Sequence, residues 1–189
     1  HGIGQEYTVF PHDGTALTII VYQQAGPLDE NGYAFTAYTG GNGNPVDADS
    51  GPAANGVWKP GTLDPGDIDI VTIEGIAGKP IFFTFGEVGP SNSLQPAYAV
   101  WGPDGQYVYG YDGSQSGGYS YTIESAPQSG IYSFVMYDKH PLSSADDAVR
   151  PYGWQLTVLG LGSFLSDDSS AITNGQTLGA RLRQGDHDI

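Results

Sequence analysis

The chain has 189 residues, a formal net charge of −15 and no cysteine, and 39% of its residues are hydrophobic. The negative charge repels nucleic acids and anionic membranes, and the lack of cysteine excludes disulfides and thiolate chemistry. The sequence also has no apolar run of about 18 residues, the length that a membrane-spanning helix needs, so we expect neither nucleic-acid binding nor membrane insertion.

Short strands bounded by turn-forming residues dominate the chain. The pattern predicts strands at residues 16–23, 33–38, 68–74, 80–85, 97–101, 106–111, 119–124, 131–137 and 153–159. A helix is indicated only at residues 143–149, which is too short to shape the fold. Such closely spaced strands are typical of an antiparallel β-sandwich. We therefore predict an all-β, jelly-roll-like sandwich with an extra N-terminal hairpin and a C-terminal strand segment.

Two of these strands indicate how the core is built. The strand at residues 131–137 carries apolar side chains on both faces, which is typical of a central strand covered on both sides. In the strand at residues 153–159, Trp154, Leu156 and Val158 alternate with other residues, so we expect these three to point inward.

The composition divides the chain into three parts. Residues 40–56 are rich in glycine, asparagine, proline and aspartate and contain few apolar side chains, which indicates a boundary. We expect an N-terminal hairpin or accessory segment in residues 1–50 and the sandwich in residues 51–161. A linker and a terminal strand follow in residues 162–189.

Motifs along the middle of the chain resemble those of a known family. They read GDID at 66–69, IFFTF at 81–85, GPDG at 102–105, SGIY at 129–132 and PYGWQLTV at 151–158. In this order they resemble the bacterial pre-peptidase C-terminal domain over about residues 57–161. The resemblance implies a β-sandwich without catalytic activity, which supports secretion or binds substrate or matrix, and which in some members binds calcium.

One motif occurs twice. Residues 63–70 read LDPGDIDI and residues 182–189 read LRQGDHDI, 119 positions apart (182 − 63 = 119). The second copy is either the entry strand of a further domain or a strand that pairs with the sheet edge of a neighbouring copy. Head-to-tail pairing of the second kind builds filaments unless the rotation closes.

Strand exchange would use residues from both ends of the chain. At the C-terminal end we expect Leu182, Gly185, Asp186, Asp188 and Ile189 to form the interface. In the N-terminal hairpin the apolar run at residues 17–21 is a second contact element, because it is more apolar than a solvated sheet edge tolerates. Its interface residues are Leu17, Ile19 and Val21.

Two positions in the sequence are candidate metal sites. Asp67 and Asp69 alternate along a strand about 7 Å apart, so they form either one wall of a Ca²⁺ site or, for Asp67, an acceptor in a turn. His1 at the start of the chain offers an amine and an imidazole to copper. Export with cleavage of a signal peptide would also leave a histidine at this position.

An aromatic ladder is the other candidate surface. Tyr107, Tyr109 and Tyr111 alternate along one strand, and Tyr119 and Tyr121 follow across a short glycine- and serine-rich connection. The ladder either stacks on sugar rings or a partner subunit, or fills the apolar face of a sandwich strand.

No nucleophile elbow, phosphate-binding loop, zinc motif or dinucleotide fingerprint occurs in the sequence. We therefore expect a non-catalytic protein that is secreted or located at the cell surface. The first hypothesis is a structural or interaction protein that binds copies of itself and assembles into fibres by terminal strand exchange. The alternatives are a calcium-assisted accessory domain that binds matrix or polysaccharide, and a copper protein that uses His1.

Overall fold

A computed structural model describes residues 48–64, 67–89, 94–111, 118–139, 149–161 and 174–177. The predicted N-terminal hairpin, the short helix and the terminal copy of the repeated motif lie outside these residues, apart from Val149 at the end of the predicted helix. Within the described part of the chain, no helix is long and apolar enough to cross a membrane.

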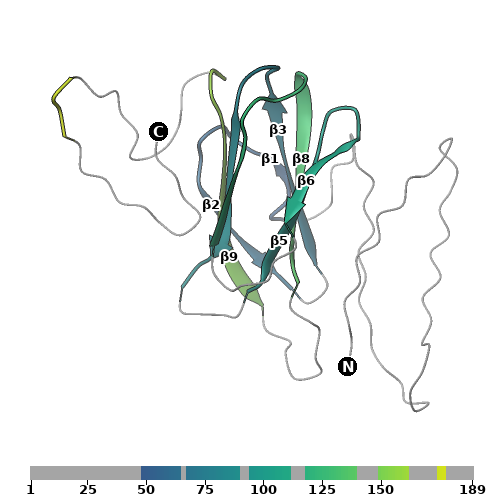
Figure 1. Cartoon of the computed structure of the whole chain (residues 1–189). Helices are drawn as coiled ribbons and strands as arrows, with labels where there is room; N and C mark the ends of the chain where they lie inside the picture. The colour runs from purple at the N-terminus through teal and green to yellow at the C-terminus, as the bar shows by residue number, and fades with distance from the viewer. Residues whose placement is uncertain are drawn as a thin grey trace, which may run out of the picture.

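The described residues form strands in two sheets, which confirms the all-β sandwich (Figure 1). The strands are β1 (Gly51–Pro52), β2 (Lys59–Leu63), β3 (Ile68–Gly75), β4 (Ile81–Glu87), β5 (Pro96–Trp101), β6 (Tyr107–Tyr111), β7 (Gly118–Ile123), β8 (Gly130–Asp138) and β9 (Arg150–Val158). One sheet has five strands in the order β1-β3-β8-β5-β6, and the other has four in the order β2-β9-β4-β7. The strands predicted between residues 68 and 159 are all present, while β1 and β2 were not predicted.

One pair of strands departs from the expected antiparallel pattern. The short β1 runs parallel to β3, with Gly51 opposite Val71, whereas the other pairs are antiparallel. At the edge of the four-stranded sheet, β2 pairs with β9, and Gly61 lies opposite Tyr152. A Cβ atom at residue 61 would overlap the Tyr152 ring, so this pairing requires glycine.

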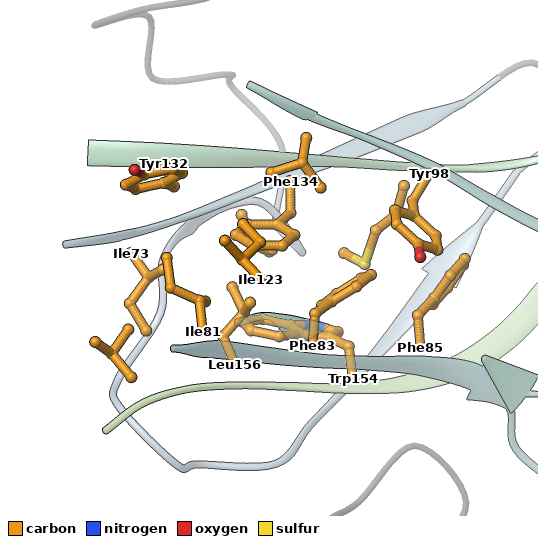
Figure 2. Packing of buried hydrophobic residues seen from close by; sticks show 14 of the residues in the cluster. Ile73, Ile81, Phe83, Phe85, Tyr98, Ile123, Tyr132, Phe134, Trp154 and Leu156 are labelled. Carbon is orange, nitrogen blue, oxygen red and sulfur yellow. The ribbon is translucent and has the colours of Figure 1, made fainter. Parts of the chain in front are cut away.

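The core fills the space between the sheets (Figure 2). The five-stranded sheet contributes Tyr98, Tyr132, Phe134 and Met136, and the four-stranded sheet contributes Ile81, Phe83, Phe85, Trp154, Leu156 and Val158. The inward direction predicted for the alternating residues of β9 is therefore confirmed. Figure 2 shows the rings of Phe134 and Tyr98 directed from one sheet toward Phe83 and Phe85 on the other.

The middle strand of the five-stranded sheet is β8, as its apolar pattern predicted. Phe134 and Met136 face the core, while Val135 belongs to a second cluster on the outer face of the same sheet. On the neighbouring β3, Ile70 joins the outer cluster and Val71 joins the core. Both strands therefore present apolar side chains on both faces.

Candidate functional site at the aromatic edge

The two sheets meet along one side at β6 and β7, which are the last strands of their sheets. Here the ring of Tyr109 stacks on the ring of Tyr121, with a centroid separation of 4.0 Å and an interplanar angle of 4°. Because β6 and β7 belong to different sheets, this ring pair bridges the sandwich edge. We call Trp101, Tyr107, Tyr109 and Tyr121 the aromatic edge.

A bulge divides the predicted tyrosine ladder. The register between β5 and β6 shifts between Val100 and Trp101, so that Tyr109 lies opposite Val100 while Tyr107 lies opposite Trp101. Tyr107 consequently packs against the Trp101 ring at 5.6 Å, edge to face, on the outer side of the sheet. Such bulges commonly redirect a side chain at the edge of a sheet.

The ring of Tyr98, which is buried in the core, packs against the core side of the edge. Its ring centroid lies 6.3 Å from that of Tyr109, 6.2 Å from that of Tyr111 and 6.1 Å from that of Tyr121. On its other side Tyr98 meets Phe83 edge to face at 5.1 Å. Tyr109 and Tyr121 therefore rest on the packed core, whereas Tyr107 rests on Trp101 at the outer face.

Two rings of the edge are open to solvent. Tyr107 is 54% exposed and Tyr109 is 36% exposed, which places both among the exposed large hydrophobic residues of the described part of the chain. A tyrosine that is both exposed and fixed by neighbouring rings offers contact area with little further loss of conformational freedom on binding. This combination is suited to recognition of a partner.

Close backbone packing holds Tyr107 in place. A Cβ atom at Gly110 would lie 2.6 Å from the Tyr107 hydroxyl oxygen and 2.9 Å from the carbonyl oxygen of Tyr98. The glycine thus leaves room for the hydroxyl end of Tyr107 beside Gly110 while β6 stays paired with β5. A side chain at this position would move the ring and strain the strand pairing.

The electrostatic surroundings of the edge favour the neutral form of the Tyr121 phenol. Burial raises the pKa of Tyr121 above its ordinary value of 10.0, and nearby Tyr109, Tyr107 and Glu124 raise it further. The hydroxyl group of Tyr121 is therefore a neutral hydrogen-bonding group at physiological pH, and it is poorly suited to act as a base or nucleophile.

The structure places the two aspartates proposed for calcium in different surroundings. Asp67 accepts a hydrogen bond on Oδ1 from the Ile68 backbone N–H at 2.8 Å, and its own N–H donates to the carbonyl of Asp64. Asp69 is fully buried and accepts on Oδ2 from the Tyr152 hydroxyl at 2.5 Å. Among the described residues, no group of three or more histidine, cysteine, aspartate or glutamate side chains could hold a metal ion. The calcium site stays a prediction.

The first copy of the repeated motif forms the passage from one sheet to the other. It begins at Leu63, the last residue of β2, and ends at Ile70 in β3. Leu63, Asp69 and Ile70 are buried, whereas Asp64 is exposed. The second copy keeps leucine, aspartate and isoleucine at the three buried positions and has Arg183 in place of Asp64. The three buried positions of the first copy are therefore all identical in the second.

The other predicted site residues lie outside the described part of the chain. These are Leu17, Ile19 and Val21 near the start, His1, and Leu182, Gly185, Asp186, Asp188 and Ile189 at the end. Their proposed roles in an interface or in copper binding stay predictions.

Trp101 is the functional candidate that the sequence interpretation missed. It closes β5 directly before the turn at Pro103, a position that the sequence shows, but its contact with Tyr107 depends on the bulge. Tyr121, which follows the ladder after one short connection in the sequence, stacks on Tyr109 although β6 and β7 belong to different sheets.

No family model and no curated protein matches this chain. Solved structures do match. The pre-peptidase C-terminal domain of a collagenase from Bacillus anthracis has 13% identity and a TM-score of 0.42, and the match covers 61% of this chain and 100% of that one. PliG of Aeromonas hydrophila, a periplasmic inhibitor of g-type lysozyme, has 18% identity and a TM-score of 0.41, with 58% and 95% covered. CorA, a surface-associated copper-binding protein of Methylomicrobium album BG8, has 12% identity and a TM-score of 0.45, with 58% and 97% covered.

These similarities concern the fold alone. The first of these structures is a pre-peptidase C-terminal domain, the class that the motifs in residues 57–161 resemble. A β-sandwich hosts many functions, and function has to be argued from the site that it carries.

Proposed function

We propose that this chain is a non-catalytic interaction module that acts outside the cytoplasm and binds a polysaccharide through the aromatic edge. The observation that carries the proposal is the pair of exposed rings, Tyr107 and Tyr109, fixed by Trp101, Tyr121 and the buried Tyr98. The cysteine-free, acidic composition supports a location outside the cytoplasm.

The chemistry of the aromatic rings and the net charge of the chain restrict the class of ligand that the edge could bind. Flat aromatic faces with polar hydroxyl tips suit a ligand that has both apolar C–H surfaces and hydroxyl groups, which is the character of a sugar ring. The net charge of −15 disfavours polyanions. The proposed ligand is therefore a neutral or cationic polysaccharide.

Retention on insoluble polysaccharides tests this function. We expect the full chain to be retained on neutral or cationic polymers such as cellulose, chitin or chitosan, and Tyr107→Ala to lose about tenfold in affinity, the size of about 1.4 kcal/mol. Val149→Ala is the matched control, because Val149 is also a large exposed residue but directly precedes β9, which lies between β2 and β4 in the four-stranded sheet. Retention that is equal for both variants, or absent for the wild type on every neutral and cationic polymer, would reject the proposal.

Whether calcium assists polysaccharide binding can be tested separately from the role of the aromatic edge. If the aspartates at the start of β3 help to hold Ca²⁺, a chelator will weaken retention, and Asp67→Asn will weaken it in the same way. If neither the chelator nor Asp67→Asn changes retention, calcium has no part in binding, and the aromatic edge remains the proposed binding surface.

A second candidate function is self-assembly by strand exchange, and the repeated motif favours it. The first copy places its shared residues Leu63, Asp69 and Ile70 in the interior, so the second copy carries the side chains of a buried sheet-to-sheet passage. Removal of residues 171–189 should then leave a folded monomer that no longer polymerises. Electron micrographs that show filaments from this truncated chain would contradict the exchange.

A further inference from the structure

The outer face of the five-stranded sheet is apolar at its centre. Ile70 pairs with Val135 and Val135 pairs with Ala99, so the three form one row across β3, β8 and β5, which we call the outer row. All three are buried, and Ile68 and Trp101 pack against them. They point away from the core, because alternate residues of a strand point to opposite faces. Core packing therefore does not account for their burial.

The burial on this face is local. Val135 is 8% exposed, whereas Ile131, which lies on the same face of β8 four residues earlier, is 46% exposed. Neighbouring side chains on a bare sheet face shield one another only in part, so they do not explain why Ile70 is only 2% exposed and Ala99 only 6% exposed. The contrast indicates that a further layer lies over the outer row and leaves Ile131 uncovered.

We propose that residues 17–21 of this same chain form that layer, with Leu17, Ile19 and Val21 directed at the outer row. These residues read LTIIV, which belongs to the most apolar stretch before the described part of the chain begins and is rich in β-branched residues that favour strands. Left in water, such a segment would be prone to aggregation. The outer row offers it a matching apolar surface.

The path of the chain allows this contact. The Ile70 backbone N–H donates to the Ser50 hydroxyl oxygen at 2.8 Å, so the chain enters the sandwich beside the outer row. Residues 21 and 48 are separated by 27 positions (48 − 21 = 27). At roughly 3.3 Å per extended residue, this length exceeds what is needed to return across neighbouring strands about 4.8 Å apart.

Disulfide trapping in the cysteine-free chain tests the contact. Val135→Cys is combined in turn with Leu17→Cys, Ile19→Cys and Val21→Cys, and each protein is oxidised at low concentration. We expect at least one pair to form an intramolecular disulfide in most molecules, because the bond requires Cβ atoms about 4 Å apart. Non-reducing gels and peptide mass mapping report the linkage.

The matched control uses Ser120→Cys with the same three partners. Ser120 is exposed on β7 in the four-stranded sheet, so we expect no intramolecular disulfide. Dimers linked through Val135→Cys would overturn the proposal and identify a second copy as the cover, and the absence of any disulfide would overturn it as well. If Val135→Cys lowers stability, Ala99→Cys replaces it in the same row.

Discussion

Aromatic rings have two different roles in this sandwich. In the core, Phe83, Phe134 and Tyr98 are almost fully buried, and Phe83 contacts the other two rings across the two sheets. At the aromatic edge, Tyr107 and Tyr109 use the same kind of ring contact but leave one side open to solvent. The difference teaches that position relative to the sheet edge, rather than residue type, determines whether a ring stabilises the fold or is available to a partner.

The largest effect is expected in the core. Phe83 stacks near Phe85 at 6.3 Å, meets Tyr98 at 5.1 Å and meets Phe134 at 4.9 Å. Phe83→Ala should lower the free energy of unfolding by about 3–5 kcal/mol, because it removes buried surface and leaves a cavity. Urea unfolding followed by tryptophan fluorescence measures the change. A loss below about 1 kcal/mol would mean that the core is not packed around this ring.

The next effect distinguishes two buried hydroxyl groups. The Tyr152 hydroxyl donates to the carboxylate of the fully buried Asp69, whereas the Tyr132 hydroxyl donates to the backbone carbonyl of Gln128 at 2.9 Å. Removing the donor from a buried acceptor costs about 1–3 kcal/mol, against about 0.5–1.5 kcal/mol for a typical neutral hydrogen bond. Tyr152→Phe should therefore cost more stability than its matched control, Tyr132→Phe. Equal losses in urea unfolding would show that the buried carboxylate does not depend on Tyr152.

A smaller effect appears at high pH. Burial raises the pKa of both Tyr121 and Tyr132 above 10.0 in the folded chain. Their stabilising contribution is fully present below the unfolded pKa of about 10 and is lost as the pH rises through the folded values. Tyr121→Phe should lose less stability than the wild type when urea unfolding is compared between about pH 9 and about pH 11. Identical pH curves would contradict the burial of this phenol at the edge.

The sequence predicted much of the fold because alternation is strong in the longer strands. In β9, Trp154, Leu156 and Val158 show the period of two, and β8 shows two apolar faces. The strand β2 was missed because Lys59, Pro60 and Gly61 look like a turn. Its glycine is needed only because the Tyr152 ring lies across it, and that contact joins residues far apart in the chain.

The candidate site was predicted only in part. The tyrosines of β6 follow from their spacing, but alternation alone places Tyr107 and Tyr109 on one face. The bulge opposite Trp101 separates them, and it depends on the pairing of β5 with β6 rather than on a local sequence signal. The alternation that joined Asp67 and Asp69 likewise gave no sign that Asp69 is buried against Tyr152.

The most direct test measures stability and binding on one protein, Tyr107→Ala. Our account predicts that its free energy of unfolding in urea stays within about 0.5 kcal/mol of the wild type, as for a surface substitution. Its retention on a neutral or cationic polysaccharide should fall about tenfold. A variant that loses stability while it keeps wild-type retention would show that the edge rings serve folding, and would contradict the assignment of the aromatic edge as the binding surface.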